Sequence, residues 1–340
     1  MSGQSLDLSA YTRGCVAQQE AFAQALLREL TQFGFVKLVH HGLSDEDVGA
    51  LFDWTRKFFA LPSSEKVRLA HPAGPEPQRG WSCVGAERTS KLYRAGLGET
   101  NIDEERFDAR EHFDLGPPDD RAWPNRWPDE RCLPGFQEFL ERYYRNCAAV
   151  SSVVLAALEQ ALGLPAGAFR ERCTHTASEL RLNHYPAIEV EELRRGVVNR
   201  IWPHTDLGVI TCLFQDGTGG LEMEDRASTA AGHKQAFLPV AQGPEGAPAE
   251  MIVSISETLQ RWTNGRLPAA VHRVELAPHL KTLQQGLVPQ RFSNAFFVKA
   301  DREVSVAPLP QFLAPKTPAL YEEMSALEYH RFRVAQAYRG

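Results

Sequence analysis

The hydrophobic periodicity of the chain changes once, near residue 178, and this change is the strongest constraint on the fold. Before it, apolar residues recur every three to four positions, as expected of amphipathic helices; after it they alternate every second position, as in half-buried strands. Short strand-like segments separated by glycine and proline continue to about residue 300, a pattern typical of a sandwich or jelly roll. We therefore expect an α+β fold with a double-stranded β-helix (jelly roll) core flanked by N-terminal and C-terminal helices.

The same pattern divides the chain of 340 residues into three regions. Residues 1–175 are expected to form a mainly helical N-terminal region. Residues 176–300 are expected to be the jelly-roll catalytic core, in which residues 225–250 form a loop. Residues 301–340 are expected to be a C-terminal helical extension that packs on the core.

Within the terminal regions, the apolar spacing predicts helices over residues 15–33, 134–162 and 318–338. Residues 70–132 are rich in proline, glycine and charge, so irregular structure with short elements is expected there. A stretch of this length is too long for a simple linker in a compact domain. It is a candidate for part of a substrate entrance.

The candidate metal ligands are His204, Asp206 and His272. His204 and Asp206 are two positions apart, so in an extended segment an imidazole and a carboxylate point to the same side. A buried strand is predicted directly after them, and it would hold the pair in place. His272 is the best candidate for a third ligand. Two histidines and one carboxylate form the facial triad of non-haem Fe(II) oxygenases, which leaves positions open for substrates, but the same donors also suit zinc.

A second constellation is Arg291 with Ser293, two positions apart in another predicted strand. A planar guanidinium with a neighbouring hydroxyl group is a receptor for a carboxylate, because arginine can grip both oxygens and serine adds a third bond. Tyr185, in the strand before the candidate metal strand, could supply a further hydroxyl. Taken alone, Arg291 also fits a surface position on a strand edge.

Composition limits the partners. The formal net charge is −6 and there is no long basic run, so nucleic acid is not an expected partner. The six cysteines are scattered without a Cys-x-x-Cys pair, which indicates reduced thiols and a cytoplasmic location. No apolar run reaches 18 residues, so no membrane span is expected. A small-molecule substrate is the expected partner, and nothing in the sequence indicates the oligomeric state.

The whole set of motifs resembles the Fe(II)/2-oxoglutarate-dependent dioxygenases of the isopenicillin N synthase-like group. The resemblance covers nearly the whole chain, and the ordered set is very specific. Its segments Phe214–Asp216 and Arg261–Asn264 are most similar to branches that act in fungal natural-product pathways. The segments that carry the resemblance are Phe33–Gly42, Phe58–Lys66, Arg110–Asp114, Asn183–Pro186, His204–Asp206, Phe214–Asp216, Gly219–Leu221, Trp262–Gly265, His272–Val274 and Arg291–Ser293.

The resemblance implies the following chemistry. His204, Asp206 and His272 would hold Fe(II). Arg291 and Ser293, helped by Tyr185, would bind the distal carboxylate of 2-oxoglutarate, and Asn183 would lie near the iron. The enzyme would consume 2-oxoglutarate and O2 and release succinate and CO2, with ascorbate as an activator in vitro. The outcome on a small organic substrate would be hydroxylation by default, or desaturation or ring rearrangement. No catalytic residue is expected beyond the metal centre.

The sequence departs from the family in one acidic position. The family usually has Gly-Asp where this chain has Ser256-Glu257. We expect Glu257 to keep the acidic role.

Three other functions stay open at this point. The first is an oxidase of the same fold, of the isopenicillin N synthase type, in which the Arg-x-Ser pair binds the substrate and 2-oxoglutarate is not used. The second is a zinc hydrolase, which the Arg-x-Ser receptor argues against. The third is a jelly-roll protein that binds metal without catalysis.

The candidate substrate-binding residues are Arg200 and Trp202. If the segment before the metal ligands is extended, both residues share the parity of His204 and point toward the iron. A fixed cation and an aromatic wall beside the metal would suit an acidic or phenolic substrate. Alternatively, Arg200 pairs with a carboxylate at the rim of the barrel.

Overall fold

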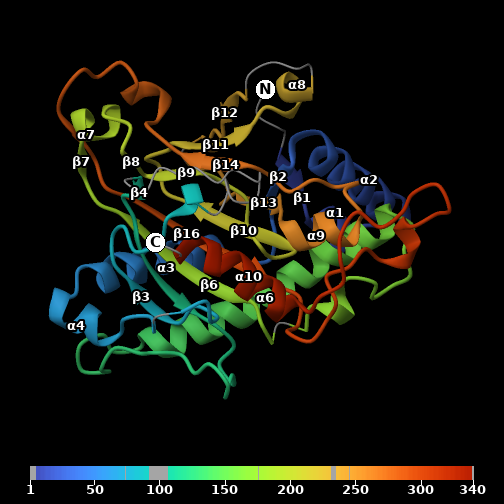
Figure 1. The fold of residues 1–340 in the computed structure, drawn as a ribbon, viewed down its shortest axis with the longest axis horizontal. Helices are drawn as coiled ribbons and strands as arrows, with labels where there is room; N and C mark the ends of the chain where they lie inside the picture. The colour runs from blue at the N-terminus through green and yellow to red at the C-terminus, as the bar shows by residue number, and fades with distance from the viewer. Residues whose placement is uncertain are drawn as a thin grey trace.

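The computed structural model describes residues 5–72, 74–91, 106–174, 176–230, 235–244 and 246–338. Two β-sheets face each other in this part of the chain (Figure 1). Residues from both sheets share one buried cluster, with Tyr185 and Ile252 from the larger sheet and Leu221 and Val274 from the smaller one. This layer between two sheets is the interior of the predicted jelly roll, so the predicted α+β fold class is confirmed.

Eight described strands form the larger sheet, which is antiparallel except for the parallel pair β1 and β2. From one edge of the sheet to the other, these strands are β1 (Ser5–Asp7), β2 (Phe35–Val39), β13 (Met251–Ile255), β10 (Ile210–Gln215), β16 (Arg291–Val298), β6 (Glu179–Tyr185), β5 (Glu111–Leu115) and β3 (Gly80–Ser82).

The smaller sheet contains four of the described strands, and two short pairs of strands lie outside both sheets. In order across the smaller sheet, its strands are β12 (Phe237–Pro239), β11 (Leu221–Glu224), β14 (His272–Val274) and β9 (Ile201–His204). The short pairs are β15 (Leu287–Val288) with β7 (Ile188–Glu189), and β4 (Phe107–Asp108) with β8 (Val198–Asn199).

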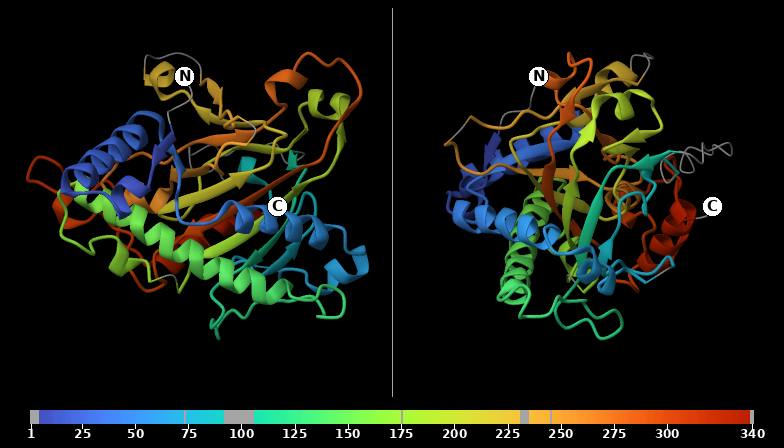
Figure 2. Two further views of the ribbon diagram at one scale, coloured as in Figure 1. Left: turned by 180° about the vertical axis from the view of Figure 1, so that it is seen from behind. Right: turned by 90° about the vertical axis from the view of Figure 1, so that its left-hand side faces the viewer.

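Three long helices cover the other face of the larger sheet (Figure 2). They are α2 (Val16–Phe33), α3 (Asp45–Phe59) and α6 (Phe136–Ala161), and α2 and α6 match the helices predicted over residues 15–33 and 134–162. Leu26, Leu51 and Leu158, one from each helix, are fully buried in the same cluster as Phe296 of β16. Burying a side chain of this kind contributes about 1.5–3 kcal/mol, so this face is the main apolar core.

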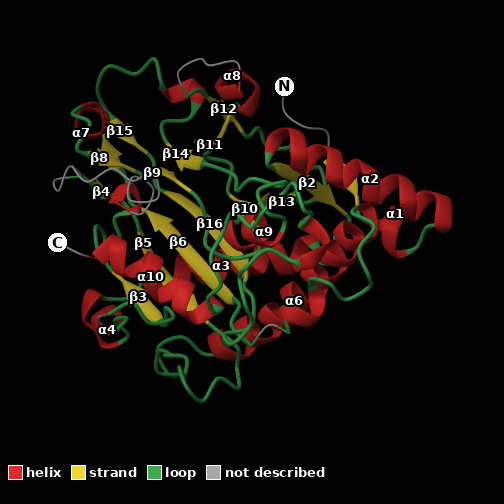
Figure 3. Cartoon of the chain, turned by 45° about the vertical axis from the view of Figure 1, so that its right-hand side comes forward, coloured by secondary structure: helices red, strands yellow, loops and turns green. Residues whose placement is uncertain are grey.

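The remaining helices are short, apart from the C-terminal one (Figure 3). They are α1 (Ser9–Thr12), α4 (Ser63–Arg68), α7 (Val190–Arg194), α8 (Arg226–Ala230), α9 (Glu257–Trp262) and α10 (Ala326–Tyr338), with single turns of 3-10 helix at Arg170–Arg172, Pro278–Leu280 and Pro310–Phe312. Within the described part of the chain, no helix has the length and apolar character needed to cross a membrane.

The N-terminal half contributes more strands than the sequence pattern predicted. β5 lies inside the proline-rich stretch and is flanked on both sides in the larger sheet, by β6 and β3. All five of its residues are buried, and three of them are charged or titratable, so it has no apolar alternation to reveal it. Residues 92–105 of the same stretch lie outside the described residues.

Two predicted boundaries were wrong. The C-terminal helix begins at Ala326, not at residue 318, because Ser325 and Glu328 bond each other's backbone N–H groups and cap it there. The predicted loop over residues 225–250 contains α8 and strand β12, the edge strand of the smaller sheet.

Candidate metal centre

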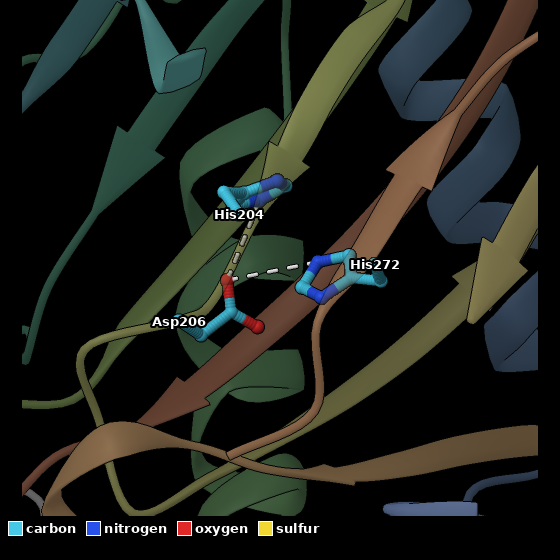
Figure 4. A group of neighbouring side chains, drawn as sticks. All are labelled: His204, Asp206 and His272. Carbon is cyan, nitrogen blue, oxygen red and sulfur yellow. Dashed lines mark ion pairs between the residues drawn. The ribbon is translucent and has the colours of Figure 1, made fainter. Parts of the chain in front are cut away.

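The smaller sheet brings the three candidate ligands together. β9 and β14 are antiparallel, and His204 at the end of β9 lies directly opposite His272 at the start of β14. Asp206 follows two residues after β9 and turns its carboxylate toward both rings (Figure 4). Asp206 Oδ1 lies 3.8 Å from His204 Nε2 and 3.9 Å from His272 Nε2. The three donor atoms all lie within 4.8 Å of one another, close enough to share one metal ion.

Hydrogen bonds fix which ring nitrogen of each histidine faces the centre. His204 Nδ1 lies 2.9 Å from the carbonyl oxygen of Trp202, and His272 Nδ1 lies 3.1 Å from that of Ala270. A carbonyl oxygen only accepts, so Nδ1 carries the proton and Nε2 keeps its lone pair. Burial, followed by the neighbouring His272, lowers the pKa of His204, which keeps the ring neutral. A neutral imidazole with a free Nε2 is the form that binds metals.

The carboxylate of Asp206 is oriented in a similar way. Its Oδ2 atom accepts a hydrogen bond of 2.6 Å from the hydroxyl of Thr211, the second residue of β10. Burial raises the pKa of Asp206, but His272 and His204 outweigh this effect and lower the pKa below its ordinary value. An ionised carboxylate with Oδ1 facing two imidazole nitrogens completes the donor set. Two nitrogens and one oxygen with an open side suit Fe(II), although the donors alone also accept zinc.

The second predicted constellation lies between the two sheets. Arg291 is paired in register with Tyr185, and Ser293 with Asn183, across β16 and β6. The Tyr185 hydroxyl lies 3.3 Å from the Ser293 hydroxyl, and the Arg291 guanidinium lies 4.7 Å from the centre of the Tyr185 ring. Arg291 donates through Nε to Gly219 O and through Nη2 to Gln215 Oε1, while its buried Nη1 has no partner. All the residues of the predicted carboxylate receptor therefore adjoin one another.

Alternation along the strand predicted that Arg200 and Trp202 point toward the metal, and the structure places both side chains elsewhere. Arg200 occupies a bend before β9, and the pairing of β9 with β14 is irregular, so alternation does not extend back from His204. The Arg200 side chain donates to the carbonyl oxygen of Pro289, and no carboxylate pairs with it among the described residues. The Trp202 indole donates to the carbonyl of Phe107 and borders a separate surface cavity. Neither side chain borders the cavity beside His204.

The cavity beside the candidate metal ligands is lined by charged residues, and most of them were not predicted as site residues from the sequence. It holds about 670 Å³ of space, part of it open to solvent, and His204, Asp206 and Leu207 form one wall. Arg110 donates to Asn183 Oδ1 at 3.2 Å and to the carboxylate of Glu87. The other polar lining residues include Gln78, Thr89, Glu179, Arg181, Lys299 and His330.

Most of these lining residues could not be predicted from patterns in the sequence. Glu87 lies in the irregular stretch, and Arg110 lies just before a strand without apolar alternation. Arg181 bonds Asp114, Glu87 and Gln78, one through each of its side-chain nitrogens. These bonds hold the wall of the cavity in place.

Glu257 links the metal loop to the rest of the molecule. Its backbone N–H donates to the carbonyl of Asp206 at 2.8 Å, and its carboxylate accepts from Thr205 Oγ1 at 2.5 Å. The same carboxylate bonds Tyr329 and Arg333 of α10. The carboxylate thus braces the loop that carries Asp206, at the position where the family has aspartate.

A jelly roll that brings two histidines and one carboxylate together, with His204 and Asp206 lining a polar cavity, has the arrangement of a mononuclear non-haem metal enzyme. Comparison with known proteins identifies the family. Residues 177–300 match the 2OG-Fe(II) oxygenase superfamily, and residues 5–130 match the family described as non-haem dioxygenase in morphine synthesis N-terminal. The chain belongs to the 2OG-Fe(II) oxygenase superfamily.

Its relatives are fungal enzymes of this family. The chain is 49% identical to the 2-oxoglutarate-dependent dioxygenase phqC of Penicillium fellutanum, over 98% of this chain and 94% of the relative. It is 41% identical to the proline hydroxylase buaE of Petromyces alliaceus, over 99% of this chain and 100% of the relative. A full-length Neurospora crassa protein, solved in complex with alpha-ketoglutarate (2-oxoglutarate), superposes with a TM-score of 0.83 at 26% identity, covering 98% of this chain and 96% of that one.

These findings confirm several predictions from the sequence: the family, the jelly-roll fold, the enzyme class and the cofactors Fe(II), 2-oxoglutarate and O2. The chain is a 2-oxoglutarate-dependent oxidoreductase, so the zinc hydrolase and the non-catalytic binding protein are set aside.

Proposed function

We propose that His204, Asp206 and His272 hold Fe(II), that Arg291, Ser293 and Tyr185 hold the distal carboxylate of 2-oxoglutarate, and that the enzyme oxidises a polar small molecule. One observation carries this proposal. Both histidines present an unprotonated Nε2 to one carboxylate oxygen of Asp206, and His204 and Asp206 line a cavity. Asn183, joined to the cavity wall through Arg110, is proposed to lie beside the metal.

When bound, Fe(II) with 2-oxoglutarate and O2 supplies the oxidising power to replace a C–H bond by C–OH, with release of succinate and CO2. The chain contributes binding and orientation. Trp202 O and Ala270 O keep the two imidazoles in the metal-binding tautomer, and Thr211 turns the carboxylate. The buried receptor around Arg291 fixes one end of the co-substrate. Hydroxylation, desaturation and ring rearrangement then depend on which substrate atom lies nearest the metal.

The proposed substrate carries both a carboxylate and an amine, as an amino acid does. Arg110 and Glu87 adjoin in the cavity wall and offer a cation and an anion to such a molecule. Burial raises the pKa of Glu87, but Arg181 and Arg110 outweigh it and hold the pKa well below its usual range, so Glu87 stays ionised. The 41% identity to a proline hydroxylase supports a cyclic amino acid or a derivative as the first candidate.

The test is the stoichiometry of 2-oxoglutarate turnover. Purified enzyme with Fe(II), 2-oxoglutarate and ascorbate is offered a panel of cyclic amino acids and their derivatives, and succinate and oxidised product are measured by mass spectrometry. We expect one succinate per product molecule, and no product from His204→Ala. Product without succinate would indicate an oxidase of the isopenicillin N synthase type and overturn the proposal.

We place this activity in the cytoplasm. All six cysteines are free thiols in the structure, and three of them, Cys147, Cys173 and Cys212, are buried. Burial raises the pKa of each of these three thiols and keeps them protonated. Such a set suits a reducing compartment.

A further inference from the structure

Two buried arginines lie side by side at the co-substrate end of the site. Arg200 and Arg291 are each 1% exposed. Arg200 donates to the carbonyl oxygen of Pro289, two residues before Arg291 in the chain. After burial, the charge of Arg291 has the largest effect on the pKa of Arg200 and lowers it, while Tyr185 and Asp216 raise it. The two guanidinium groups therefore share one small region between the sheets.

Neither arginine forms an ion pair with a carboxylate of the described residues. Within the described part of the chain, no carboxylate lies within 4.0 Å of either guanidinium, whereas other buried arginines, such as Arg181, are paired with carboxylates. The bonds of Arg200 and Arg291 run to carbonyl and amide oxygens only. Each also keeps one buried N–H without a partner, Nε of Arg200 and Nη1 of Arg291.

Such an arrangement is unfavourable without an anion. A buried, unpaired charge carries a desolvation cost of several kcal/mol, and two like charges add repulsion to it. Burial, followed by the charge of Arg291, lowers the pKa of Arg200 to about 10. Arg200 is therefore still charged near neutral pH. An anion that enters between them removes the repulsion and satisfies both free donors.

We propose that Arg200 and Arg291 together form a two-guanidinium site for the distal carboxylate of 2-oxoglutarate, so that Arg200 positions the co-substrate. This rests on the proposed function. A carboxylate has about four lone-pair sites. The candidate donors are the buried Nε of Arg200, the buried Nη1 of Arg291, and whichever hydroxyl of the bonded pair Ser293 and Tyr185 does not donate to the other. These donors suit one carboxylate.

This assignment replaces the two roles considered for Arg200 from the sequence. A contact with the primary substrate would require Arg200 to border the cavity beside His204, and it does not. A structural ion pair would require a neighbouring carboxylate, and none pairs with it in the described residues. Its position beside Arg291 and Tyr185 is explained by the co-substrate.

The experiment combines a substitution of Arg200 with a change of ligand that removes the distal carboxylate, and it compares the effects on binding affinity. Anaerobic Fe(II)-loaded enzyme is titrated by calorimetry with 2-oxoglutarate and with 2-oxopentanoate, in which a methyl group replaces the distal carboxylate. In Arg200→Gln we expect the affinity for 2-oxoglutarate to fall about tenfold or more, as for a lost bond to a charged group. The affinity for 2-oxopentanoate should stay within about twofold, because the change does not affect the keto acid end.

The same titrations separate the other outcomes. Equal losses for both ligands would mean that Arg200 acts only through the structure, and unchanged affinities would mean that it does not contact the carboxylate; either result overturns the inference. Arg200→Lys, which keeps the charge without the planar fork, should show an intermediate loss for 2-oxoglutarate alone. This variant also serves if Arg200→Gln does not fold.

A matched control is Arg226→Gln. Arg226 also donates to backbone carbonyls, those of Leu30 and Pro268 among them, and burial lowers its pKa too, but Arg291 is not among the groups that act on its pKa. Its loss should not change the ratio of the two affinities. If the wild-type enzyme does not bind 2-oxoglutarate more tightly than 2-oxopentanoate, the proposed function itself fails; if it does but Arg200→Gln behaves like the control, only the role of Arg200 fails.

Discussion

At the scale of single residues, the two histidines of the candidate metal centre are oriented in the same way. Each ring bonds the carbonyl oxygen two residues earlier in its own segment, Trp202 for His204 and Ala270 for His272. Because each partner belongs to the same short segment as its histidine, the tautomer is set by local backbone geometry. No acidic partner is then needed to orient either ring, which leaves Asp206 for the metal.

The first prediction concerns Arg291. Arg291→Lys keeps the positive charge but loses the planar fork and the bonds to Gly219 and Gln215. We expect the affinity for 2-oxoglutarate to fall at least about tenfold, or about 1.4 kcal/mol. The measurement is the co-substrate concentration that gives half-maximal succinate release. An unchanged value would mean that Arg291 holds something else.

The second prediction concerns His41, a buried histidine outside the candidate metal centre. His41 is 4% exposed, its Nδ1 accepts from the backbone N–H of Leu43 at 3.3 Å, and its Nε2 donates to Ala249 O at 3.0 Å. Burial lowers its pKa below the ordinary value. Protonation would place a second N–H against that of Leu43, so the folded state requires neutral His41.

Stability should therefore depend on pH through His41. Because its pKa is lower in the folded state, the unfolded chain takes up the proton first, and stability is lost as pH falls below about 6.5. When the pH falls from 7.5 to 5.5, the free energy of unfolding of the wild type should drop by up to about 1.4 kcal/mol more than that of His41→Gln. Urea denaturation at both pH values measures the two drops. The same change at the exposed His279 should not alter the dependence. Parallel curves for wild type and His41→Gln would contradict this interpretation.

At the scale of elements, helix α10 is attached to the metal site by one buried carboxylate. Glu257 bonds Thr205, between the proposed ligands His204 and Asp206, and it also bonds Tyr329 and Arg333 of α10. Side chains of α10, His330 and Val334, line the cavity beside the metal. The position of this helix therefore decides both the shape of the cavity and its access to water.

The third prediction follows from this attachment. Arg333→Met leaves the Glu257 carboxylate, 7% exposed, without its cation. Breaking a buried pair in this way should lower the free energy of unfolding by about 3 kcal/mol, measured by urea denaturation. A loosened α10 should also raise the fraction of 2-oxoglutarate consumed without substrate oxidation.

A control lies two residues away on the same helix. Arg331 pairs with Glu76 at the surface, and the two side chains are 43% and 37% exposed. Arg331→Met should cost less than about 1 kcal/mol and leave the coupling unchanged. Equal effects of the two substitutions would show that Glu257 does not hold α10 in place.

At the scale of the whole molecule, the chain forms one continuous sheet across the predicted boundary at residue 175. β1 and β2 extend the larger sheet at one edge, and β5 and β3 extend it at the other. All four strands come from the first 175 residues, so the predicted N-terminal region and core share backbone hydrogen bonds. The three-region division describes the order of elements along the chain, and the sheet joins the first two regions.

The sequence predicted what depends on periodicity and short spacing. The helices over residues 16–33 and 136–161, the jelly roll and the convergence of His204 with Asp206 all follow from local patterns. Long-range placement was not predictable in the same way. β5 is buried on both faces among charged partners, so it has no apolar alternation. Arg200 departs from the expected parity because a bend precedes β9. The contact of Glu87 with Arg110 depends on tertiary packing.

Anaerobic titration of the metal-free protein with Fe(II), followed by calorimetry, tests the proposed site most directly. The wild type should bind one Fe(II) per chain. His272→Ala and Asp206→Ala should each weaken binding at least about a hundredfold, because loss of a ligand exceeds the roughly 10–100-fold cost of losing a residue that only supports one. The exposed histidine variant His279→Ala should bind Fe(II) like the wild type. Wild-type affinity in His272→Ala would contradict the assignment of His204, Asp206 and His272 as the iron ligands.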